Sequence, residues 1–280
     1  MLSCIETLGR TPGKEGIQRM LLAPIIWVLT VVIMYFFAAK VWWFPPPISQ
    51  HGLAYDAQFM RTLVITGVIF FFAQLALGWV IFRFRDDGRR AGYSHGNNKW
   101  ETIWTSATAI LFVGLVLTGT KIWVAVHLSE PDPNAIPIEL MAKQFAFSFR
   151  YPGPDGKFGA TDLKQVNDAA GNPFGIVDSD PAGKDDIVSA SLKVPAGKPI
   201  KLILHSRDVI HNFFVRELRL KQDIVPGMEI PFYFQADVPG TYEIPCSELC
   251  GLGHFQMRST MQVMSEAEFE QWKKEQAANQ

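Results

Sequence analysis

Three long stretches of this sequence contain no charged side chain, and they constrain the fold more than any other feature. They cover residues 21–39, 62–82 and 102–120 and are 19, 21 and 19 residues long. An α-helix needs about 20 apolar residues to cross roughly 30 Å of hydrocarbon in a bilayer. We therefore predict three membrane-spanning helices, which excludes a disordered chain and a single soluble domain.

The basic residues of the loops predict the orientation of these helices, because cytoplasmic loops are enriched in Lys and Arg. The tail before the first span and the loop after the second span carry most of them, whereas residues 44–61 contain only Arg61. We therefore place the N-terminus in the cytoplasm and the chain after the third span outside. The first stretch is too long for a signal-peptide core and lacks a small-residue cleavage site. We interpret it as a retained anchor, with a cleaved leader as the alternative.

Charge divides the chain into two unlike halves. Residues 1–126 carry 11 basic and 6 acidic side chains, a net charge of +5, and residues 127–280 carry 15 and 21, a net charge of −6. An acidic outer half makes nucleic acid an unsuitable partner and favours a cationic protein partner. The three cysteines are too few for a disulfide framework, and we interpret Cys4, in the polar tail, as incidental.

The residues after the third span follow the period of β-strands. Phe145, Phe147 and Phe149 alternate within residues 142–151, which is typical of a strand with one buried face. Residues 152–186 are rich in Gly, Pro and Asp, and we expect a long surface loop there. Further short apolar runs, separated by turn residues, predict a β-sandwich or barrel. These runs cover residues 187–194, 200–205, 213–220, 230–234 and 240–245.

The end of the chain predicts a helix, because Ser265 is followed three residues later by Glu268, the spacing of a capping box. We therefore expect four parts along the chain. They are a cytoplasmic tail (1–20), a three-span membrane region (21–126), an extracytoplasmic β-domain (127–265) and a C-terminal helical tail (266–280).

A cluster of soft metal ligands lies between two of the predicted strands. Residues 246–257 read Cys-Ser-Glu-Leu-Cys-Gly-Leu-Gly-His-Phe-Gln-Met. Thiolate, imidazole and thioether groups together suit copper, including Cu(I), and the glycines let the loop fold back so that its ligands converge. A second imidazole is available upstream. The candidate ligands are His211, Cys246, Cys250, His254 and Met257.

Two arrangements of copper fit these residues. A mononuclear site uses two His, one Cys and a weak axial Met, and it leaves Cys246 as a spare thiol, a redox liability beside copper. If both thiolates bridge two copper ions, every candidate ligand is used, and we favour this dinuclear interpretation. A disulfide between Cys246 and Cys250 is the alternative outside the cytoplasm. His205 lies within a predicted strand, and we expect it to be structural.

The pattern C-x-E-x-C-G-x-x-H-x-x-M in residues 246–257 closely resembles the signature of cytochrome c oxidase subunit II. Residues 208–227 look like the upstream histidine region of that family, and residues 97–105 are similar to part of its membrane hairpin. The resemblance covers roughly residues 60–270. Its copper motif is highly specific, and its membrane motif is moderately so.

The resemblance implies a cupredoxin-like Greek-key domain that carries a dinuclear copper A centre. In this reading the two thiolates bridge the metals, each metal has one terminal imidazole, and the axial ligands are a thioether and a backbone carbonyl. The bridging thiolates would be Cys246 and Cys250, the imidazoles His211 and His254, the thioether Met257, and the carbonyl that of Glu248.

The resemblance also assigns roles to three carboxylates. The Glu248 carboxylate would face a Mg²⁺ site shared with subunit I, and Asp223 would lie near the path from copper to that subunit. Glu101, at the cytoplasmic start of the third span, would sit at the mouth of a proton pathway. The alternative for Glu101 is a carboxylate stabilised by the N-terminus of its helix.

The implied function is that of subunit II of an aa3-type cytochrome c oxidase in a bacterial inner membrane, with subunits I and III as partners. Electrons from a c-type cytochrome would pass through copper to subunit I, where O₂ is reduced and protons are pumped. The alternatives are a copper-lacking quinol oxidase subunit, the copper domain of a nitric-oxide or nitrous-oxide reductase, and a copper chaperone. The retained ligands argue against the first, the region of Glu101 favours an oxidase, and a chaperone would need a βαβ pattern that the sequence lacks.

The sequence departs from the family pattern in three places. The family usually has two spans, so residues 21–39 form an additional one, and the insertion at 152–186 is longer than usual. Phe145 stands where the family has an electron-entry Trp, which makes it the candidate entry residue here. No C-x-x-C-H motif is present, so no haem c is attached to this chain. We therefore expect a donor cytochrome that is tethered or held in a stable complex, with docking more apolar than ionic.

Overall fold

The computed structural model describes residues 14–41, 43–84, 92–93, 95–128 and 132–278, with the backbone alone at 14–20 and 278. The chain forms two compact units, Met1–Phe44 with Ala57–Lys121 and Pro45–Asp56 with Ile122–Gln280. Cys4 and several basic residues of the tail and the second loop lie outside the described residues.

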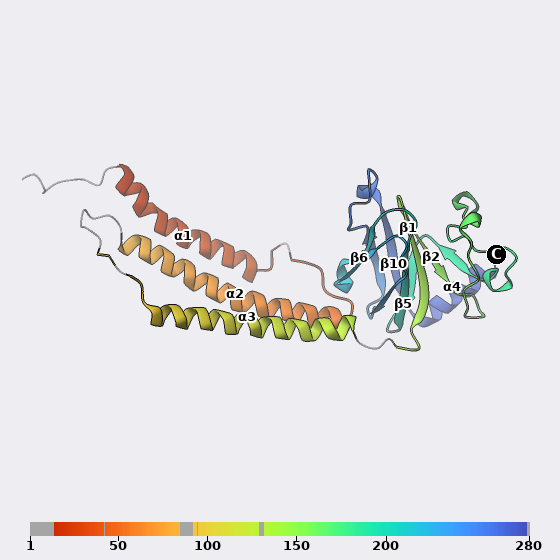
Figure 1. The fold of residues 1–280 in the computed structure, drawn as a ribbon, viewed down its shortest axis with the longest axis horizontal. Helices are drawn as coiled ribbons and strands as arrows, with labels where there is room; N and C mark the ends of the chain where they lie inside the picture. Colours follow the sequence, from red (N-terminus) through yellow and green to blue (C-terminus); the bar gives the residue numbers. More distant parts are fainter. Residues whose placement is uncertain (1–13, 42, 85–91, 94, 129–131, 279–280) are drawn as a thin grey trace, which may run out of the picture. The chain divides into compact units, whose positions relative to one another are not determined.

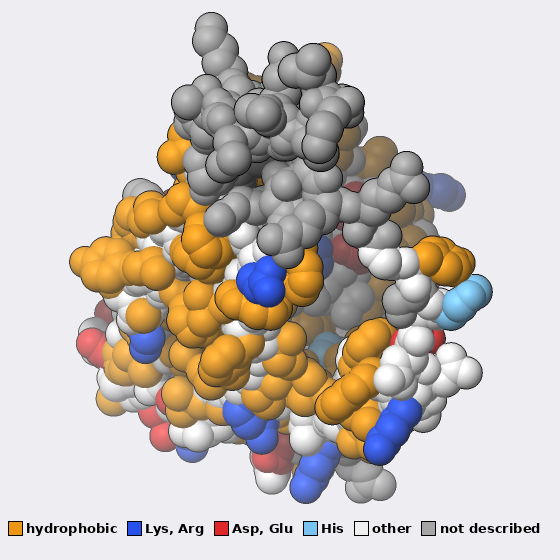
Figure 2. Space-filling model, turned by 90° about the vertical axis from the view of Figure 1, so that its left-hand side faces the viewer, with side chains coloured by type: hydrophobic (Ala, Val, Ile, Leu, Met, Phe, Trp, Pro, Cys, Tyr) orange, Lys and Arg blue, Asp and Glu red, His pale blue; other side chains and the backbone are white. Residues whose placement is uncertain are grey.

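Among the described residues, three helices are long and apolar enough to cross a membrane. They are α1 (Lys14–Ala38), α2 (Gln50–Arg83) and α3 (Asn98–His127) (Figure 1). Hydrophobic side chains occupy much of the described surface in the view of Figure 2, with charged side chains scattered around them. The prediction of three spans is confirmed.

Polar side chains connect the helices of the first unit. The Trp27 indole of α1 donates a hydrogen bond to the Leu75 carbonyl of α2 at 3.3 Å, and Gln58 of α2 donates to the Leu115 carbonyl of α3 at 3.1 Å. At 34 residues, α2 is about 51 Å long, well beyond the hydrocarbon thickness. This helix is therefore longer than a crossing of the hydrocarbon requires.

The second unit is a β-sandwich whose two layers enclose the core. One layer is a five-stranded sheet with the order β3-β2-β1-β5-β8, in which β1 and β5 run parallel. The other contains the sheet β4-β10-β9 and the hairpin β6-β7, whose strand β6 contacts β9. The strands are β1 (Ile136–Lys143), β2 (Ala146–Tyr151), β3 (Ile187–Ser189), β4 (Leu192–Pro195), β5 (Pro199–Ser206), β6 (His211–Val215), β7 (Leu220–Ile224), β8 (Ile230–Gln235), β9 (Gly240–Pro245) and β10 (Arg258–Met264).

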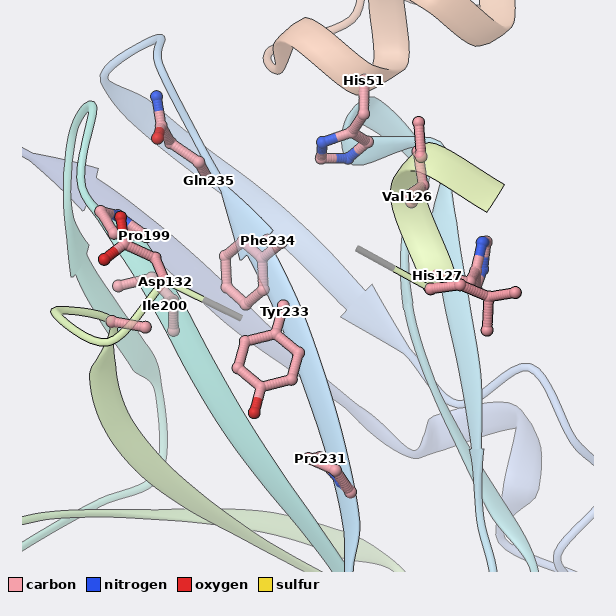
Figure 3. A pocket seen from close by; sticks show the side chains of 13 residues that line it. His51, Val126, His127, Asp132, Pro199, Ile200, Pro231, Tyr233, Phe234 and Gln235 are labelled. Carbon is pink, nitrogen blue, oxygen red and sulfur yellow. The ribbon is translucent and has the colours of Figure 1, made fainter. Parts of the chain in front are cut away.

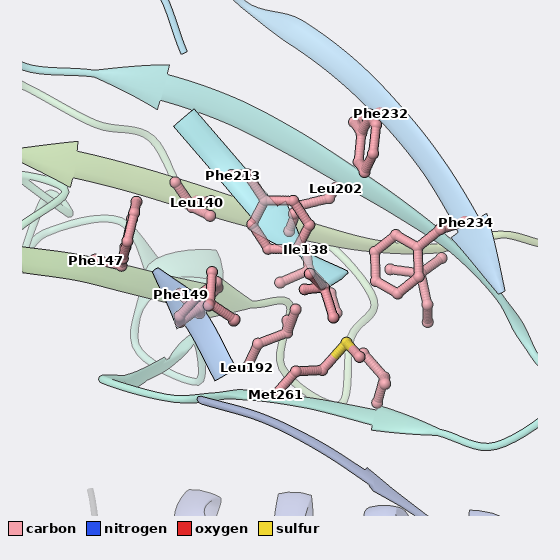
Figure 4. Close-up of a cluster of buried hydrophobic side chains, with 14 of the residues drawn as sticks. Ile138, Leu140, Phe147, Phe149, Leu192, Leu202, Phe213, Phe232, Phe234 and Met261 are labelled. Atoms are coloured by element: carbon pink, nitrogen blue, oxygen red, sulfur yellow. The ribbon is translucent and has the colours of Figure 1, made fainter. Parts of the chain in front are cut away.

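Alternation along the strands builds this core. Ile138 and Leu140 of β1 are fully buried, and Leu202 of β5 lies opposite Ile138 in register. Phe213 of β6 and Met261 of β10 meet these side chains from the other layer (Figure 4). The predicted fold class, a three-helix membrane anchor with a β-sandwich of the cupredoxin type, is confirmed.

Three predicted strands are wrong in their bounds because turns interrupt the apolar runs. Residues 142–151 contain the end of β1, a turn at Gln144 and Phe145, and the whole of β2. Residues 213–220 contain a break at Arg219, whose φ of 60° lies in the left-handed region. Residues 187–194 are divided between β3 and β4. A run of apolar residues cannot by itself distinguish one strand from two that share a face.

The insertion at 152–186 is more ordered than the predicted surface loop. It contains three short 3-10 helices, Leu163–Gln165, Asp168–Ala170 and Pro181–Gly183, each with a side-chain cap at its N-terminus. After the last strand, helix α4 (Glu266–Ala278) begins as predicted. Ser265 and Glu268 exchange hydrogen bonds through their side chains and backbone N–H groups, which forms the capping box.

The segment that precedes and begins α2 packs against the β-sandwich. The Ile48 N–H donates to the Glu217 carbonyl at 3.0 Å, and the Asp237 N–H donates to the Ile48 carbonyl at 2.7 Å. Arg219 forms an ion pair with Asp56 at 2.8 Å. A cavity of about 500 Å³ lies within this unit, lined by residues from the ends of α2 and α3 and from β5 and β8 (Figure 3). None of the predicted site residues lines it.

Candidate metal centre

The cluster of soft ligands lies on the loop between β9 and β10, two antiparallel neighbours. Pro245 and Arg258 face each other in register at the base of this loop. The Cys246 N–H donates to the Met257 carbonyl at 3.0 Å, so the loop closes on its first and last ligand. Twelve residues between adjacent strands are thereby folded into a compact ring. This closure turns four ligands that are near in sequence into neighbours in space.

The two cysteine sulfurs occupy the centre of the donor cluster, 3.8 Å apart. Nδ1 of His211 lies 3.9 Å from the Cys246 sulfur, and Nδ1 of His254 lies 3.6 Å from the Cys250 sulfur. Each sulfur also has a weaker donor beside it. The Glu248 carbonyl oxygen is 3.2 Å from Cys246, and the Met257 sulfur is 3.7 Å from Cys250.

Strand β6 carries His211 into this cluster from a distant part of the sequence. The His211 side chain is fully buried, and its Nε2 lies 2.8 Å from a carboxylate oxygen of Asp208. This contact directs Nδ1 toward the sulfurs, as outer partners of ligating histidines usually do. Burial lowers the pKa of His211, but its hydrogen bonds to Cys246 and Asp208 outweigh burial and raise the pKa overall.

The two thiols differ in acidity. Burial opposes ionisation of Cys246, but hydrogen bonds with His211 and with the backbone of Glu248 and Asn212 lower its pKa to about 6. Burial and the nearby Cys246 charge raise the pKa of Cys250 to about 11. Near neutral pH the pair is therefore one thiolate and one thiol. Binding a metal through both sulfurs releases the Cys250 proton.

The turn at Gln144 and Phe145 packs directly on the ligand loop. The Gln144 side chain donates to the Cys250 carbonyl at 2.5 Å. A Cβ at Gly253 would lie only 2.4 Å from the Phe145 ring, and a Cβ at Gly251 would lie 2.7 Å from the Gln144 amide nitrogen. Gly251 also has a φ of 133°, which few other residues adopt. Both glycines are therefore required for this close approach.

The donor set fits copper. A metal–thiolate bond is about 2.3 Å long, so sulfurs 3.8 Å apart can both contact one ion. Thiolate, imidazole and thioether donors select copper among the first-row metals. Burial of Cys246, Cys250 and Met257 keeps these groups away from water. The separation of the sulfurs exceeds the 2.05 Å of a disulfide, and both cysteines are free thiols in this structure.

The structure brings together the groups that the sequence offered as candidate ligands: His211, Cys246, Cys250, His254, Met257 and the Glu248 carbonyl. The Glu248 side chain is exposed, and Asp223 accepts a hydrogen bond from the buried Asn212 side chain at 2.6 Å. Glu101 lies in the first turn of α3, in the helical unit, and is separate from this cluster.

Two residues of the site had no predicted function. Asp208 stands three positions before His211, and this spacing was a local signal for a carboxylate that orients the histidine. Gln144 is 106 positions from Cys250, and only the fold brings the two residues together. Phe145, the candidate electron-entry residue, lies against the ligand loop at Gly251 and Gly253, in a turn between β1 and β2, and it is 40% exposed.

Comparisons with known proteins agree with this site. The model of the family "cytochrome c oxidase subunit II, periplasmic domain" matches residues 181–264. An alternative cytochrome c oxidase subunit 2 from Bradyrhizobium diazoefficiens is 36% identical over 234 residues, which cover 82% of this chain and 83% of the relative. Cytochrome c oxidase subunit 2 of Thermostichus vulcanus is 29% identical over 286 residues, covering 90% and 86%.

A solved structure of the periplasmic domain of cytochrome oxidase subunit II from Bradyrhizobium japonicum is 26% identical, with a TM-score of 0.40. The match covers 54% of this chain and 99% of that domain.

A β-sandwich on membrane spans, with soft ligands on the loop between two strands, defines a membrane-anchored cupredoxin-like protein. Within that class, this chain belongs to the cytochrome c oxidase subunit II family. The resemblance drawn from the motif at 246–257 is thereby confirmed. As a member of this family, the chain is part of an oxidoreductase complex and has other oxidase subunits as partners.

Proposed function

We propose that this chain is the electron-entry subunit of an aa3-type oxidase and holds two copper ions between Cys246 and Cys250. It would accept electrons from a c-type cytochrome and pass them to subunit I, where O₂ reduction is coupled to proton pumping. The observation that carries the proposal is the arrangement of one imidazole and one weaker donor beside each of two adjacent sulfurs. A mononuclear site would use only one of these halves fully.

When bound, copper would supply an electron carrier whose oxidation state changes by one. The residues of the chain keep that carrier in a fixed geometry. Buried Cys246, Cys250 and Met257 exclude water, Asp208 fixes the orientation of the His211 ring, and Gln144 holds the Cys250 carbonyl. A rigid ligand cage lowers the reorganisation that accompanies each electron transfer.

The test is the copper content and the EPR spectrum of the full-length chain in detergent. We expect two copper ions per chain and, in the oxidised form, a signal from one unpaired electron shared by two equivalent nuclei. A single copper with a localised signal would reject the dinuclear site. A Met257→Leu variant is the matched control, because it removes a weak donor and leaves both thiolates in place.

The surface around the ligand loop favours an apolar docking face for the donor. Four large apolar side chains, here called the apolar collar, lie on the loop or against it. Leu249, Leu252 and Phe255 are 79%, 97% and 79% exposed, and Phe145 completes the set. Large exposed apolar side chains that gather in one place mark interaction sites. We therefore propose a donor cytochrome that is tethered or held in a stable complex, with Phe145 at the point of electron entry.

The remaining assignments concern the partners and the membrane. The exposed Glu248 carboxylate is available for a Mg²⁺ site with subunit I, and subunit III completes the complex. We propose an inner-membrane protein with a cytoplasmic N-terminus and the copper domain on the periplasmic side. Glu101 lies in the first turn of α3, which Asn97 caps by accepting hydrogen bonds from the Lys99 and Trp100 N–H groups. We propose that at this helix end Glu101 takes up protons from the cytoplasm.

A further inference from the structure

The insertion at 152–186 is fixed to the interior of the β-sandwich at its base. The Arg150 side chain of β2 is fully buried and forms ion pairs with Asp186 and with Glu139 of β1. It also donates a hydrogen bond to the Gly159 carbonyl, and Asp186 accepts one from the Gly159 N–H at 2.9 Å. Breaking a buried ion pair of this kind is costly, so the base of the insertion is held firmly.

From this base the insertion places one carboxylate between two other segments. Asp168, on the second 3-10 helix, lies 2.6 Å from the Lys143 ammonium group. Its two oxygens also accept hydrogen bonds from the Arg207 guanidinium group, at 3.1 and 2.7 Å. These two cations lower the pKa of Asp168 to about 2. A bidentate pair fixes geometry as well as charge.

The two cations precede the residues that hold the metal ligands. Lys143 is followed by Gln144, which donates to the Cys250 carbonyl. Arg207 is followed by Asp208, which orients His211. The two segments are also joined to each other, because the Gln144 N–H donates to the Asp208 carboxylate at 2.7 Å and the Arg207 N–H donates to the Ala142 carbonyl at 3.0 Å.

We propose that Asp168 is a positioning residue for the metal centre, and that the insertion acts as a strut between the buried Arg150 and the outer partners of the ligands. The proposal rests on the copper function proposed above. Asp168 touches no ligand; it holds Lys143 and Arg207, and through them the placement of Gln144 and Asp208. Outer partners of this kind typically contribute about 10–100-fold to metal affinity.

The experiment compares Asp168→Asn with Asp178→Asn in the full-length chain in detergent. Asp178 is an exposed carboxylate of the same insertion that forms no ion pair with any residue in the described part of the chain. We expect Asp168→Asn to weaken copper binding about tenfold in a chelator competition, the lower end of the range for outer partners because Asp168 acts one step further out. Asp178→Asn should match the wild type.

A second readout needs no metal. In the copper-free chain, Asp168→Asn should speed hydrogen exchange at the backbone of Ala142–Phe145 and Arg207–Val209, with exchange elsewhere in the sandwich unchanged. Asp168→Glu keeps the charge and both cationic partners, so it should restore most of the copper affinity. Because ion pairs near the surface contribute little to folding, these variants should fold.

Two results would overturn the proposal. One is an Asp168→Asn variant with the copper affinity and exchange pattern of Asp178→Asn. The other is faster exchange throughout the sandwich, which would mean a general loss of stability. Either result leaves the copper function intact, since that function fails only if the wild-type chain does not bind two copper ions.

Discussion

The ligand loop and the turn that covers it differ in how far their contacts reach along the chain. Cys246, Cys250, His254 and Met257 lie within twelve residues, and the loop closes through a hydrogen bond between its own ends. The turn at Gln144 contacts Cys250, a residue 106 positions away. A metal ligand set can be local because one loop supplies it, whereas the groups that orient ligands are supplied by whichever strands the fold brings near.

The first prediction removes a thiol that the proposed dinuclear site requires. Cys246→Ser should reduce the copper content from two ions to at most one and abolish the signal of an electron shared by two metals, because the proposed site loses one of its two sulfur donors and Cys250 alone leaves it incomplete. Metal analysis and EPR of the full-length variant measure this. Met257→Leu, which removes a weak donor of the same loop, should retain two ions with one held less tightly. Retention of two coppers by the serine variant would contradict the bridging role.

The second prediction tests whether His211, supplied by a distant strand, controls the acidity of a thiol on the loop. In the copper-free chain the Cys246 thiol should ionise near pH 6. The ultraviolet absorbance of the thiolate measures this transition. His211→Ala removes its hydrogen bond and should move the transition upward toward the ordinary value of 9. His205→Ala, on β5, is the control and should leave it unchanged.

The sign of the stability effect follows from the same change in pKa. The pKa of Cys246 in the folded chain lies below that of a thiol in the unfolded chain. Cys246 therefore stabilises the copper-free fold fully above pH 9, and this contribution is lost as the pH falls through 6. Denaturant titrations of the wild type and of His211→Ala across this window should diverge as the pH rises.

The third prediction concerns the contact between the two regions. Gly253→Ala would place a methyl group 2.4 Å from the Phe145 ring. With a φ of −90° at Gly253, the backbone itself accepts alanine. We expect copper affinity to fall about fivefold, equivalent to the 1 kcal/mol at the lower end of overpacking costs. The double variant Gly253→Ala with Phe145→Ala removes the clash and should recover the copper affinity. If the double variant binds copper as weakly as Gly253→Ala alone, the strain does not come from the Phe145 ring.

The same difference between contacts that are near and contacts that are distant along the chain explains what the sequence could predict. The spans, the strands β5, β8 and β9 and the capping box at Ser265 are local patterns, and all were predicted correctly. The break after Lys143 and the left-handed Arg219 interrupt apolar runs without any Gly or Pro to mark them. The importance of Asp168 could not be predicted, because its partners Lys143 and Arg207 are 25 and 39 residues away along the chain.

The fourth prediction concerns the apolar collar, and its variant should leave copper binding unchanged. Phe145→Ala should weaken donor binding about fivefold, since truncation of a central aromatic contact costs at least about 1 kcal/mol. Copper content should not change. Electron transfer from the donor should depend weakly on salt, because exposed charges are screened beyond about 10 Å at 0.1 M ionic strength whereas apolar contacts are not. Stopped-flow reduction that is fast with a soluble cytochrome c and collapses as salt rises would favour a charge-steered donor instead.

The last prediction extends the comparison to the helical unit, where the expected effect on the copper site is zero. Glu101 lies in the first turn of α3, and its carboxylate can either supply protons or only stabilise the helix N-terminus. Glu101→Ala should slow turnover of the assembled oxidase while its copper content and EPR signal stay as in the wild type. Glu101→Asp keeps a carboxylate in the first turn and should retain most of the turnover. Glu101→Gln separates the two roles, because it keeps the length and polarity of the side chain but cannot release a proton. If the glutamine variant turns over normally in an intact complex, Glu101 contributes only to the end of its helix.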